Sequence, residues 1–360
     1  GEAAVALAEK VDGNASWWKS YLEGVEDMKL HSWTQSLDFS KWPPDIFKEV
    51  SRMYASTYWD SVHVPLPRVE RLEFGDLDPI VSWLMPVKDT PSSWLDLALD
   101  SIEHQEGMDP KSWELIVVDD GSTVLETKAT LEAWAQKGQI QVINGSACGI
   151  AAALNEGWKR CRGRYICRLD GDDCAHPERL KKQIGFLERH PSIAVLGAGF
   201  CTFQDGDPRS LPKASLKRYR MPGHPILARW RMIFSCSLAH PTVTFRRSAF
   251  KSFNIYPEGH AAEDHWCWLS LPLEIPLANM ADVLCYLRRH PSSVSSRSAV
   301  ALENSSFGAV QAFLKREVDM ELSLEDVKIL WGKGNAESPQ QADRVSKALD
   351  ALESLFLKMA

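Results

Sequence analysis

Three carboxylates follow one short apolar segment near the middle of the chain. The segment comprises residues 164–169, and Asp170, Asp172 and Asp173 come directly after it. Carboxylates this close repel one another, and a hard divalent cation held by oxygen ligands is the simplest countercharge. Mg²⁺ and Mn²⁺ keep part of their coordination shell for water and substrate phosphates. The cluster therefore indicates an anchor for a bound diphosphate.

A second interpretation of the same residues remains open. A solvated acidic turn could simply precede a helix, with Asp173 or Cys174 near its N-cap and His176-Pro177 at its start. Short acidic turns are common, so the three carboxylates alone do not decide between a metal site and a helix start.

The elements that must position these carboxylates alternate between strands and helices from residue 78 onward. We expect strands at 80–85, 114–118, 140–143 and 164–169, and helices at 92–105, 124–136 and 151–161. Near-continuous apolar strands separated by helices predict a doubly wound, mostly parallel, Rossmann-like α/β sheet that is covered on both faces. Ligands of such a sheet bind at the carboxyl ends of its strands.

Three of those carboxyl ends carry polar or turn-forming residues. They are Pro86 to Asp89, Asp119-Asp120-Gly121-Ser122, and Asp170 to Asp173. The first strand–helix turn lacks Gly-x-Gly-x-x-Gly, and no Gly-x-x-x-x-Gly-Lys-Ser/Thr occurs in the chain. The sequence therefore disfavours dinucleotide redox chemistry and P-loop hydrolysis. The phosphates of a bound nucleotide would have to be held by metal.

Six motifs in the chain have a familiar order and spacing. They are Val81-Ser-Trp-Leu-Met-Pro-Val, Glu114-Leu-Ile-Val-Val-Asp-Asp-Gly-Ser, Gly149-Ile-Ala-Ala-Ala-Leu-Asn-Glu-Gly, Arg168-Leu-Asp-Gly-Asp-Asp, His240-Pro-Thr-Val-Thr-Phe-Arg-Arg and Ala262-Glu-Asp-His-Trp-Cys-Trp-Leu. In these motifs the chain resembles family 2 glycosyltransferases, which have the nucleotide-diphospho-sugar transferase (GT-A type) fold. The resemblance covers about residues 79–298 and neither end of the chain.

The resemblance implies roles for individual residues. Asp264 would be the catalytic base, Asp172 or Asp173 would bind Mn²⁺ or Mg²⁺, and Asp120 would accept a hydrogen bond from the uracil ring. The nucleotide-sugar contacts would come from Pro86, Val87, Asp89, Asp120, Gly149, Asn155, Arg168, Asp170, Gly171 and Asp172. The acceptor or the diphosphate would lie near His240, Glu263, Arg288 and His290. Where the family often has Tyr-Asn after Pro-Val, this chain has Lys88-Asp89, so base stacking at that point is left open.

We therefore expect an inverting, metal-dependent glycosyltransferase that moves a hexose or N-acetylhexosamine from a UDP-sugar to a hydroxyl of a carbohydrate, glycoconjugate or protein. A sugar nucleotidyltransferase is one alternative, because it shares the sheet and the metal–diphosphate site. It would release pyrophosphate and would not need a base at Glu263-Asp264. A non-catalytic nucleotide-sugar-binding or scaffold protein is the other alternative, although the intact catalytic carboxylates argue against it.

The same patterns predict three regions. Residues 1–78 form an aromatic-rich helical N-terminal extension, and residues 299–360 form a helical C-terminal region. Between them, residues 79–298 form the catalytic domain, with a nucleotide-sugar half at 79–200 and an acceptor half at 201–298. In the acceptor half we expect a basic loop at 208–225 that could close over the diphosphate, and a strand that ends before Tyr286 to His290.

Composition excludes some classes of partner. The formal net charge is -7, from 41 basic and 48 acidic residues, which gives no support to a nucleic-acid partner. No run approaches the roughly 18 apolar residues of a membrane span. The eight cysteines form no Cys-x-x-Cys pair, so we expect free thiols in a reducing compartment such as the cytoplasm. Gly1 in place of Met leaves open that a targeting segment is missing.

Overall fold

A computed structural model describes residues 79–359 of the chain, except residues 139, 224, 253, 292 and 294–298. The described residues up to 309 belong to one compact unit, and those from 310 onward belong to a second. The N-terminal extension expected at residues 1–78 lies outside the described residues.

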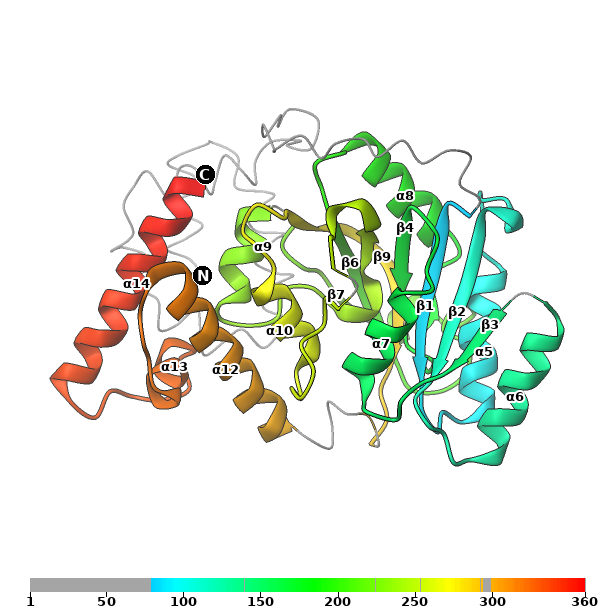
Figure 1. Cartoon of the computed structure of the whole chain (residues 1–360), viewed down its shortest axis with the longest axis horizontal. Coiled ribbons are helices and arrows are strands. Elements are labelled where there is room, and N and C mark those ends of the chain that lie inside the picture. Colours follow the sequence, from blue (N-terminus) through cyan, green and yellow to red (C-terminus); the bar gives the residue numbers. More distant parts are fainter. Residues whose placement is uncertain are drawn as a thin grey trace. The chain divides into compact units, whose positions relative to one another are not determined.

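Four parallel strands form the first half of the sheet. They are β1 (Val81–Val87), β2 (Trp113–Asp119), β3 (Ile140–Asn144) and β4 (Tyr165–Arg168), and they lie side by side in the order β3-β2-β1-β4. The helices between them are α5 (Ser92–Glu103), α6 (Leu125–Gln136) and α7 (Ile150–Trp158) (Figure 1). The chain moves outward from β1 to β3 and then returns to the other side of β1. Because such crossovers are right-handed, α5 and α6 cover one face of the sheet and α7 covers the other.

The second half of the sheet is mixed. β8 (Thr244–Arg246) runs antiparallel between β4 and β6 (Val195–Phe203), and the long β9 (Leu277–Arg288) runs parallel to β6. Two short strands run antiparallel to their neighbours: β5 (Cys174–Ala175) pairs with β9, and β7 (Lys217–Tyr219) pairs with β6. The expected doubly wound, mostly parallel sheet is thus confirmed, with nine strands of which the three antiparallel ones are two or three residues long.

The remaining elements of this unit lie in the connections between strands, with η3 before β2 and the others in the mixed half. The helices are α8 (Arg179–Arg189), α9 (Pro225–Met232) and α10 (Glu263–Ser270), and the 3-10 turns are η3 (Pro110–Ser112), η4 (Lys213–Ser215), η5 (His240–Thr242) and η6 (Arg247–Ala249). A group of buried aromatic rings joins them to the sheet, because the ring centroid of Phe245 lies 5.0 Å from that of Trp158 and 5.7 Å from that of Trp268. Burying a large apolar side chain contributes about 1.5–3 kcal/mol, so this group is a main source of stability.

One buried arginine fixes the end of β4. Arg179 lies in the first turn of α8 and is fully buried. Its guanidinium donates to the carbonyl oxygens of Arg168 and Pro241, each at 2.8 Å, and to Oε1 of Gln183 at 2.9 Å. A buried guanidinium is tolerated when its donors are satisfied in this way. The backbone of Arg168, which directly precedes the turn that carries the carboxylates, is therefore held in place.

Three local expectations from the sequence are wrong. Residues 208–225 are not one loop, because they contain η4 and β7. Tyr286 does not follow a strand, because β9 extends to Arg288. Asp173 and Cys174 are not at a helix N-cap, because Cys174 pairs with Tyr286 in the sheet and the next helix begins at Arg179.

The C-terminal region is helical, as the sequence indicates. Its helices are α12 (Ala299–Val318), α13 (Leu324–Leu330) and α14 (Pro339–Met359). Ser323 caps α13 in a capping box with Asp326, whose carboxylate also accepts hydrogen bonds from Arg344 of α14 at 3.1 and 3.3 Å. Of the helices that the structure describes, none is both long and apolar enough to cross a membrane.

Candidate functional site

The three carboxylates of the sequence motif meet at the end of β4. Oxygens of Asp170, Asp172 and Asp173 lie within 4.8 Å of one another. They follow the strand that lies beside β1, where the chain changes its direction of travel across the sheet. Ligands of open α/β sheets bind at such a point, outside the carboxyl ends of the strands.

Each carboxylate has a different partner. The buried guanidinium of Arg168 binds both oxygens of Asp170, at 2.5 and 2.6 Å. Asp173 is 4% exposed and accepts the backbone N–H of Arg288 at 2.8 Å. Asp172 is paired with Nε2 of His290 at 2.9 Å, and its side chain keeps 28% of its surface exposed. The side chain of Asp170 is 27% exposed, but Arg168 occupies both of its oxygens, so Asp172 has the oxygens that are most available to a ligand.

Burial and repulsion within the cluster disfavour the charged forms of Asp170 and Asp173. Burial raises the pKa of Asp170, against the attraction of Arg168. Burial and repulsion by Asp172 raise the pKa of Asp173 well above its ordinary value. A divalent cation would relieve this repulsion, and carboxylate oxygens are the ligands that Mg²⁺ and Mn²⁺ prefer. The donor set therefore fits a hard divalent cation.

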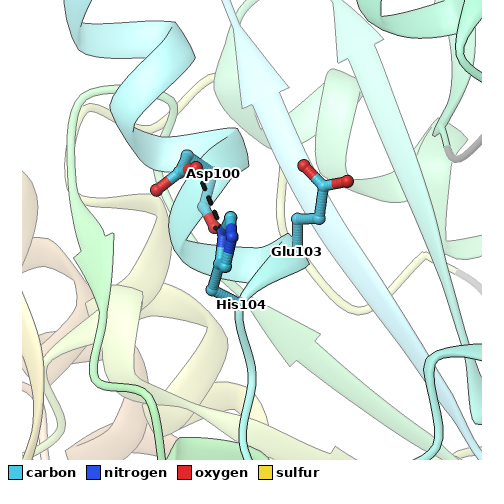
Figure 2. A group of neighbouring side chains, drawn as sticks. All are labelled: Asp100, Glu103 and His104. Atoms are coloured by element: carbon cyan, nitrogen blue, oxygen red, sulfur yellow. Dashed lines mark hydrogen bonds and ion pairs between the residues drawn. The ribbon is translucent and has the colours of Figure 1, made fainter.

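A second group of potential metal ligands lies at the end of α5, where Figure 2 shows Asp100, Glu103 and His104. Asp100 is bound by the guanidinium of Arg209 at 2.7 Å, and His104 lies 3.1 Å from its other oxygen. The charge of Asp100 is thus already balanced by protein. Of the two groups found among the described residues, the one at the end of β4 is the better cation site.

Arg288 and His290 hold the turn that carries the carboxylates. Arg288 donates from Nε to the carbonyl oxygen of Asp172 at 3.1 Å, and its guanidinium lies 4.4 Å from the ring centroid of Phe203 and 4.9 Å from that of Trp94. The ring of His290 lies 4.7 Å from that of Trp94. Both residues therefore lie at the carboxylate cluster, where the side chain of Arg288 contacts the backbone of the turn and His290 contacts Asp172.

A fourth carboxylate, Asp120, lies at the end of β2. It is 3% exposed, and its backbone N–H donates to the carbonyl oxygen of Val87 at 2.8 Å. Oδ2 accepts the backbone N–H of Gly149 at 3.1 Å and lies 3.6 Å from the ammonium of Lys88. Gly149 has a φ of 98°, a backbone conformation that a residue with a side chain rarely adopts. The ends of β1 and β2 and the start of α7 thus meet around this carboxylate.

Asp89 connects the same two loops. Oδ1 accepts the backbone N–H groups of Thr123 at 2.6 Å and Val124 at 2.9 Å, and its own N–H donates to Oγ of Ser122 at 2.9 Å. The bonds from Val124 and Thr123 lower the pKa of Asp89. The residue has a φ of 47°, which is uncommon for a residue other than glycine. Its carboxylate is therefore occupied by the loop that follows Asp120.

The rest of the predicted donor site comes from the end of β1 and the turn after β4. Pro86 is half-buried at the end of β1, and Val87 is buried beside it. Gly171 lies in the carboxylate turn, where a Cβ atom would come within 3.1 Å of Cγ2 of Val87. A glycine at this position allows the turn to pack closely against β1.

Asn155, which was also predicted to contact the nucleotide-sugar, forms hydrogen bonds with the backbone of Tyr256. Its Nδ2 donates to the carbonyl oxygen of Tyr256 at 2.9 Å, and its Oδ1 accepts the backbone N–H of Tyr256 at 3.1 Å. The hydroxyl of Tyr256 is in turn 2.9 Å from Nε2 of His240. Asn155 therefore acts through the backbone of Tyr256, and it positions the buried ring of His240.

His240 lies between the carboxylates of β4 and those of α10. Burial, together with Arg168, lowers the pKa of His240 to about 3, while Asp264 and Asp170 oppose this shift. The ring is therefore neutral near pH 7. Its Nδ1 lies 3.4 Å from Oε1 of Glu263. His240 thus links the cluster at the end of β4 to the first turn of α10.

Asp264 lies in that first turn and is half-buried. Oδ1 accepts the backbone N–H of His265 at 2.7 Å, and the thiol of Cys236 lies 3.7 Å from Oδ2. Burial raises the pKa of Asp264, and repulsion by Glu263 adds to the shift. A carboxylate with a raised pKa is a stronger proton acceptor, so Asp264 is suited to act as a general base.

The sequence did not identify three residues that contact the site: Trp94, Cys236 and Tyr256. Trp94 contacts Arg288 and His290 from the first turn of α5. A tryptophan beside a helix start is visible in the sequence, but nothing there indicates its partners. Cys236 and Tyr256 approach Asp264 and His240 only through folding, so no local pattern identifies them.

Comparisons with known proteins agree with this arrangement. The family model described as Glycosyl transferase family 2 matches residues 82–253. The amylovoran biosynthesis glycosyltransferase AmsE of Erwinia amylovora is 31% identical over 214 residues, which cover 58% of this chain and 76% of that protein. The bifunctional glycosyltransferase pgtA of Dictyostelium discoideum is 29% identical over 276 residues, or 64% of this chain, and the match spans only 35% of pgtA.

Two solved structures have a similar fold. One is S. aureus TarS 1-349 in complex with UDP-GlcNAc, with a TM-score of 0.53, 20% identity, and coverage of 76% of this chain and 81% of TarS 1-349. The other is the mannosyltransferase PcManGT from Pyrobaculum calidifontis in complex with GDP-Man and Mn²⁺, with a TM-score of 0.50, 14% identity, and coverage of 98% and 86%. At these identities the likeness establishes the fold alone.

Proposed function

The chain belongs to glycosyltransferase family 2, and from this premise we propose an inverting, metal-dependent enzyme that transfers a hexose or N-acetylhexosamine from a UDP-sugar to an acceptor hydroxyl. The observation that carries this proposal is the convergence of three carboxylates at the end of β4, where the sheet offers its ligand site. The complexes of TarS with UDP-GlcNAc and of PcManGT with GDP-Man support a nucleotide-sugar donor.

The metal would be Mn²⁺ or Mg²⁺, held by Asp172 with Asp173 beside it. The exposed oxygens of Asp172 favour it as the direct ligand, since Arg168 occupies both oxygens of Asp170 and Arg288 holds Asp173. His290 already contacts Asp172 and lies where it could join the ligand set. A bound cation would neutralise the diphosphate and so favour its departure. The Mn²⁺ in the PcManGT complex supports this assignment.

Asp264 would take the proton of the acceptor hydroxyl. As the acceptor oxygen bonds to the anomeric carbon, the bond from that carbon to the diphosphate breaks and UDP leaves on the opposite side. The configuration of the sugar is inverted. A positioned carboxylate base contributes about 10² to 10⁴ in rate. Asp264 and Asp170 both raise the pKa of His240 against the effect of burial, which supports a single site that contains the donor carboxylates and the base.

One experiment tests the donor, the metal and the base together. Wild-type protein would be incubated with a panel of UDP- and GDP-sugars and candidate acceptors, with Mn²⁺, with Mg²⁺ or with excess EDTA. We expect release of a nucleoside diphosphate that EDTA abolishes. Asp172→Asn should weaken UDP binding as strongly as EDTA does. Asp264→Asn should lose at least a hundredfold in transfer rate while it binds UDP normally.

Asp350→Asn is a matched control, since it removes one exposed carboxylate from α14 and should change none of these quantities. UDP affinity that is unchanged in excess EDTA would contradict the metal assignment. A product that retains the anomeric configuration of the donor, or full activity of Asp264→Asn, would contradict the inverting mechanism. Release of pyrophosphate would identify a nucleotidyltransferase.

A further inference from the structure

One oxygen of Asp120 has no hydrogen-bond partner in the part of the chain that the structure describes. Oδ1 is buried and accepts no hydrogen bond, although Oδ2 of the same carboxylate accepts the N–H of Gly149. A buried acceptor without a donor is destabilising, and such an atom in a ligand site indicates that a ligand supplies the donor. A carboxylate oxygen can only accept, so the missing group is an N–H or O–H of the ligand.

A donor lies beside the other oxygen of Asp120. The ammonium of Lys88 is 3.6 Å from Oδ2 of Asp120, and the side chain of Lys88 is 53% exposed. The long side chain of Lys88 can shift to admit a ligand, since it is the exposed member of the pair.

The backbone that carries both side chains is fixed. Asp89 follows Lys88 and binds the N–H groups of Thr123 and Val124, and the N–H of Asp120 binds the carbonyl oxygen of Val87. The backbone positions of Lys88 and Asp120 are therefore fixed before any ligand arrives. This lowers the cost of ordering the two side chains around one edge of a ring.

We propose that Lys88 is a base-specificity residue, which donates to the 4-oxygen of uracil or the 6-oxygen of guanine while Asp120 accepts the adjacent ring N–H. This inference rests on the proposed function, because it concerns the base of the same nucleotide-sugar donor. Uracil and guanine present a ring N–H next to a carbonyl oxygen. Cytosine and adenine present a ring nitrogen with a lone pair at that position, which the carboxylate of Asp120 would repel. The site therefore selects uracil or guanine.

The test measures the affinity of UDP, GDP, CDP, ADP and 4-thio-UDP by calorimetry, for wild-type protein and for Lys88→Met. Wild type should bind UDP or GDP at least tenfold more tightly than CDP and ADP, and the comparison of UDP with GDP identifies which base is used. Lys88→Met should bind the preferred nucleotide about tenfold more weakly, since a hydrogen bond from a charged donor is lost. Lys159→Met removes an exposed lysine at the end of α7 and should bind like wild type.

The sulfur analogue separates a contact with the base from a contact with the phosphates. If UDP is preferred, wild type should lose affinity for 4-thio-UDP, whose sulfur is a poor acceptor, and Lys88→Met should no longer distinguish it from UDP. Equal losses of UDP and 4-thio-UDP affinity in Lys88→Met would show that Lys88 does not contact the 4-oxygen and would overturn the inference. Tighter binding of CDP or ADP would overturn it as well. Failure of every nucleotide to bind wild type would contradict the proposed function itself.

Discussion

At the scale of single residues, Glu263 is a carboxylate whose pKa lies close to 7. Burial raises the pKa of Glu263 to about 7, while Arg168 opposes the shift and Asp170 adds to it. Nδ1 of His240 lies 3.4 Å from its carboxylate, and Asp264 follows it in the chain. Because the ordinary pKa of a glutamate is about 4.3, the folded protein favours the protonated form of Glu263.

This shift predicts a pH dependence of stability. A raised folded-state pKa gives stability that is present below the ordinary pKa and is lost as pH rises toward 7. Relative to Glu263→Gln, the wild-type free energy of unfolding should therefore fall by about 2–4 kcal/mol between pH 4.5 and pH 8. Urea denaturation of both proteins across this range measures the difference. Parallel pH profiles would contradict the prediction. The difference includes the repulsion between Glu263 and Asp264, since Glu263 adds to the burial that raises the pKa of Asp264.

The sequence predicted which residues form the site more completely than it predicted their partners. Asp170, Asp172 and Asp173 lie in one short motif, so the end of one strand brings them together. The partners of Asn155 and Asp89 are separated from them along the chain, as in the bonds of Asn155 with Tyr256, 101 residues away. No local pattern encodes such a contact, because it forms only when the elements pack.

At the scale of elements, the loops after β1 and β2 behave as one unit because Asp89 joins them. Asp89→Ala removes the acceptor for two backbone N–H groups and leaves a φ of 47° that alanine tolerates poorly. We expect a loss of about 1–2 kcal/mol in the free energy of unfolding and weaker UDP binding. Hydrogen exchange at residues 122–124 should become faster.

Asp89→Asn is the matched control, since asparagine keeps an oxygen acceptor and tolerates this backbone conformation. It should retain most of the stability and the slow exchange. If Asp89→Ala and Asp89→Asn have the same stability and the same hydrogen exchange at residues 122–124, the carboxylate of Asp89 does not hold the two loops together.

The strands that were poorly predicted from the sequence have exposed charged residues or no regular alternation of buried and exposed residues. β7 contains Lys217 and Arg218, which are exposed, so its composition is that of a loop. Charged residues on such a strand protect a sheet against pairing with other chains, which explains why a strand can have this sequence. β9 has exposed residues in its middle and a shifted register with β6 near Ala198 and Gly199, so no clean alternation marks it.

At the scale of the whole molecule, the eight cysteines are free thiols. Six are buried, Cys236 is half-buried, and Cys148 is exposed. Burial raises the pKa of Cys236 well above its ordinary value and that of Cys285 to about 12, which lowers their reactivity. The expectation of free thiols from the sequence is thus confirmed for all eight.

Titration with a thiol reagent checks this arrangement in solution. One thiol, Cys148, should react rapidly in the native protein, and Cys148→Ser should abolish that phase. All eight thiols should react in denaturant without prior reduction. Fewer than eight reactive thiols in unreduced, denatured protein would reveal a disulfide and contradict the structure.

The fold of the first half was predictable because its strands are apolar and its helices intervene in a regular order. The second half was less predictable, since its pairings join distant segments, as when Cys174 pairs with Tyr286. Pairing between segments so far apart depends on the packing of the whole sheet, and a strand of two residues carries almost no local signal.

The link between the carboxylate turn and the end of β9 limits how this enzyme can be recombined with its relatives. Asp173 accepts a backbone N–H of Arg288, which any residue except proline would supply. The bond from Nε of Arg288 to the carbonyl oxygen of Asp172, and the pair of His290 with Asp172, depend on side chains. A chimera that exchanges residues 201–298 for those of another transferase therefore also replaces Arg288 and His290, whose side chains hold the carboxylate turn. The seam of a working chimera must keep residues 168–173 and 286–290 from the same parent.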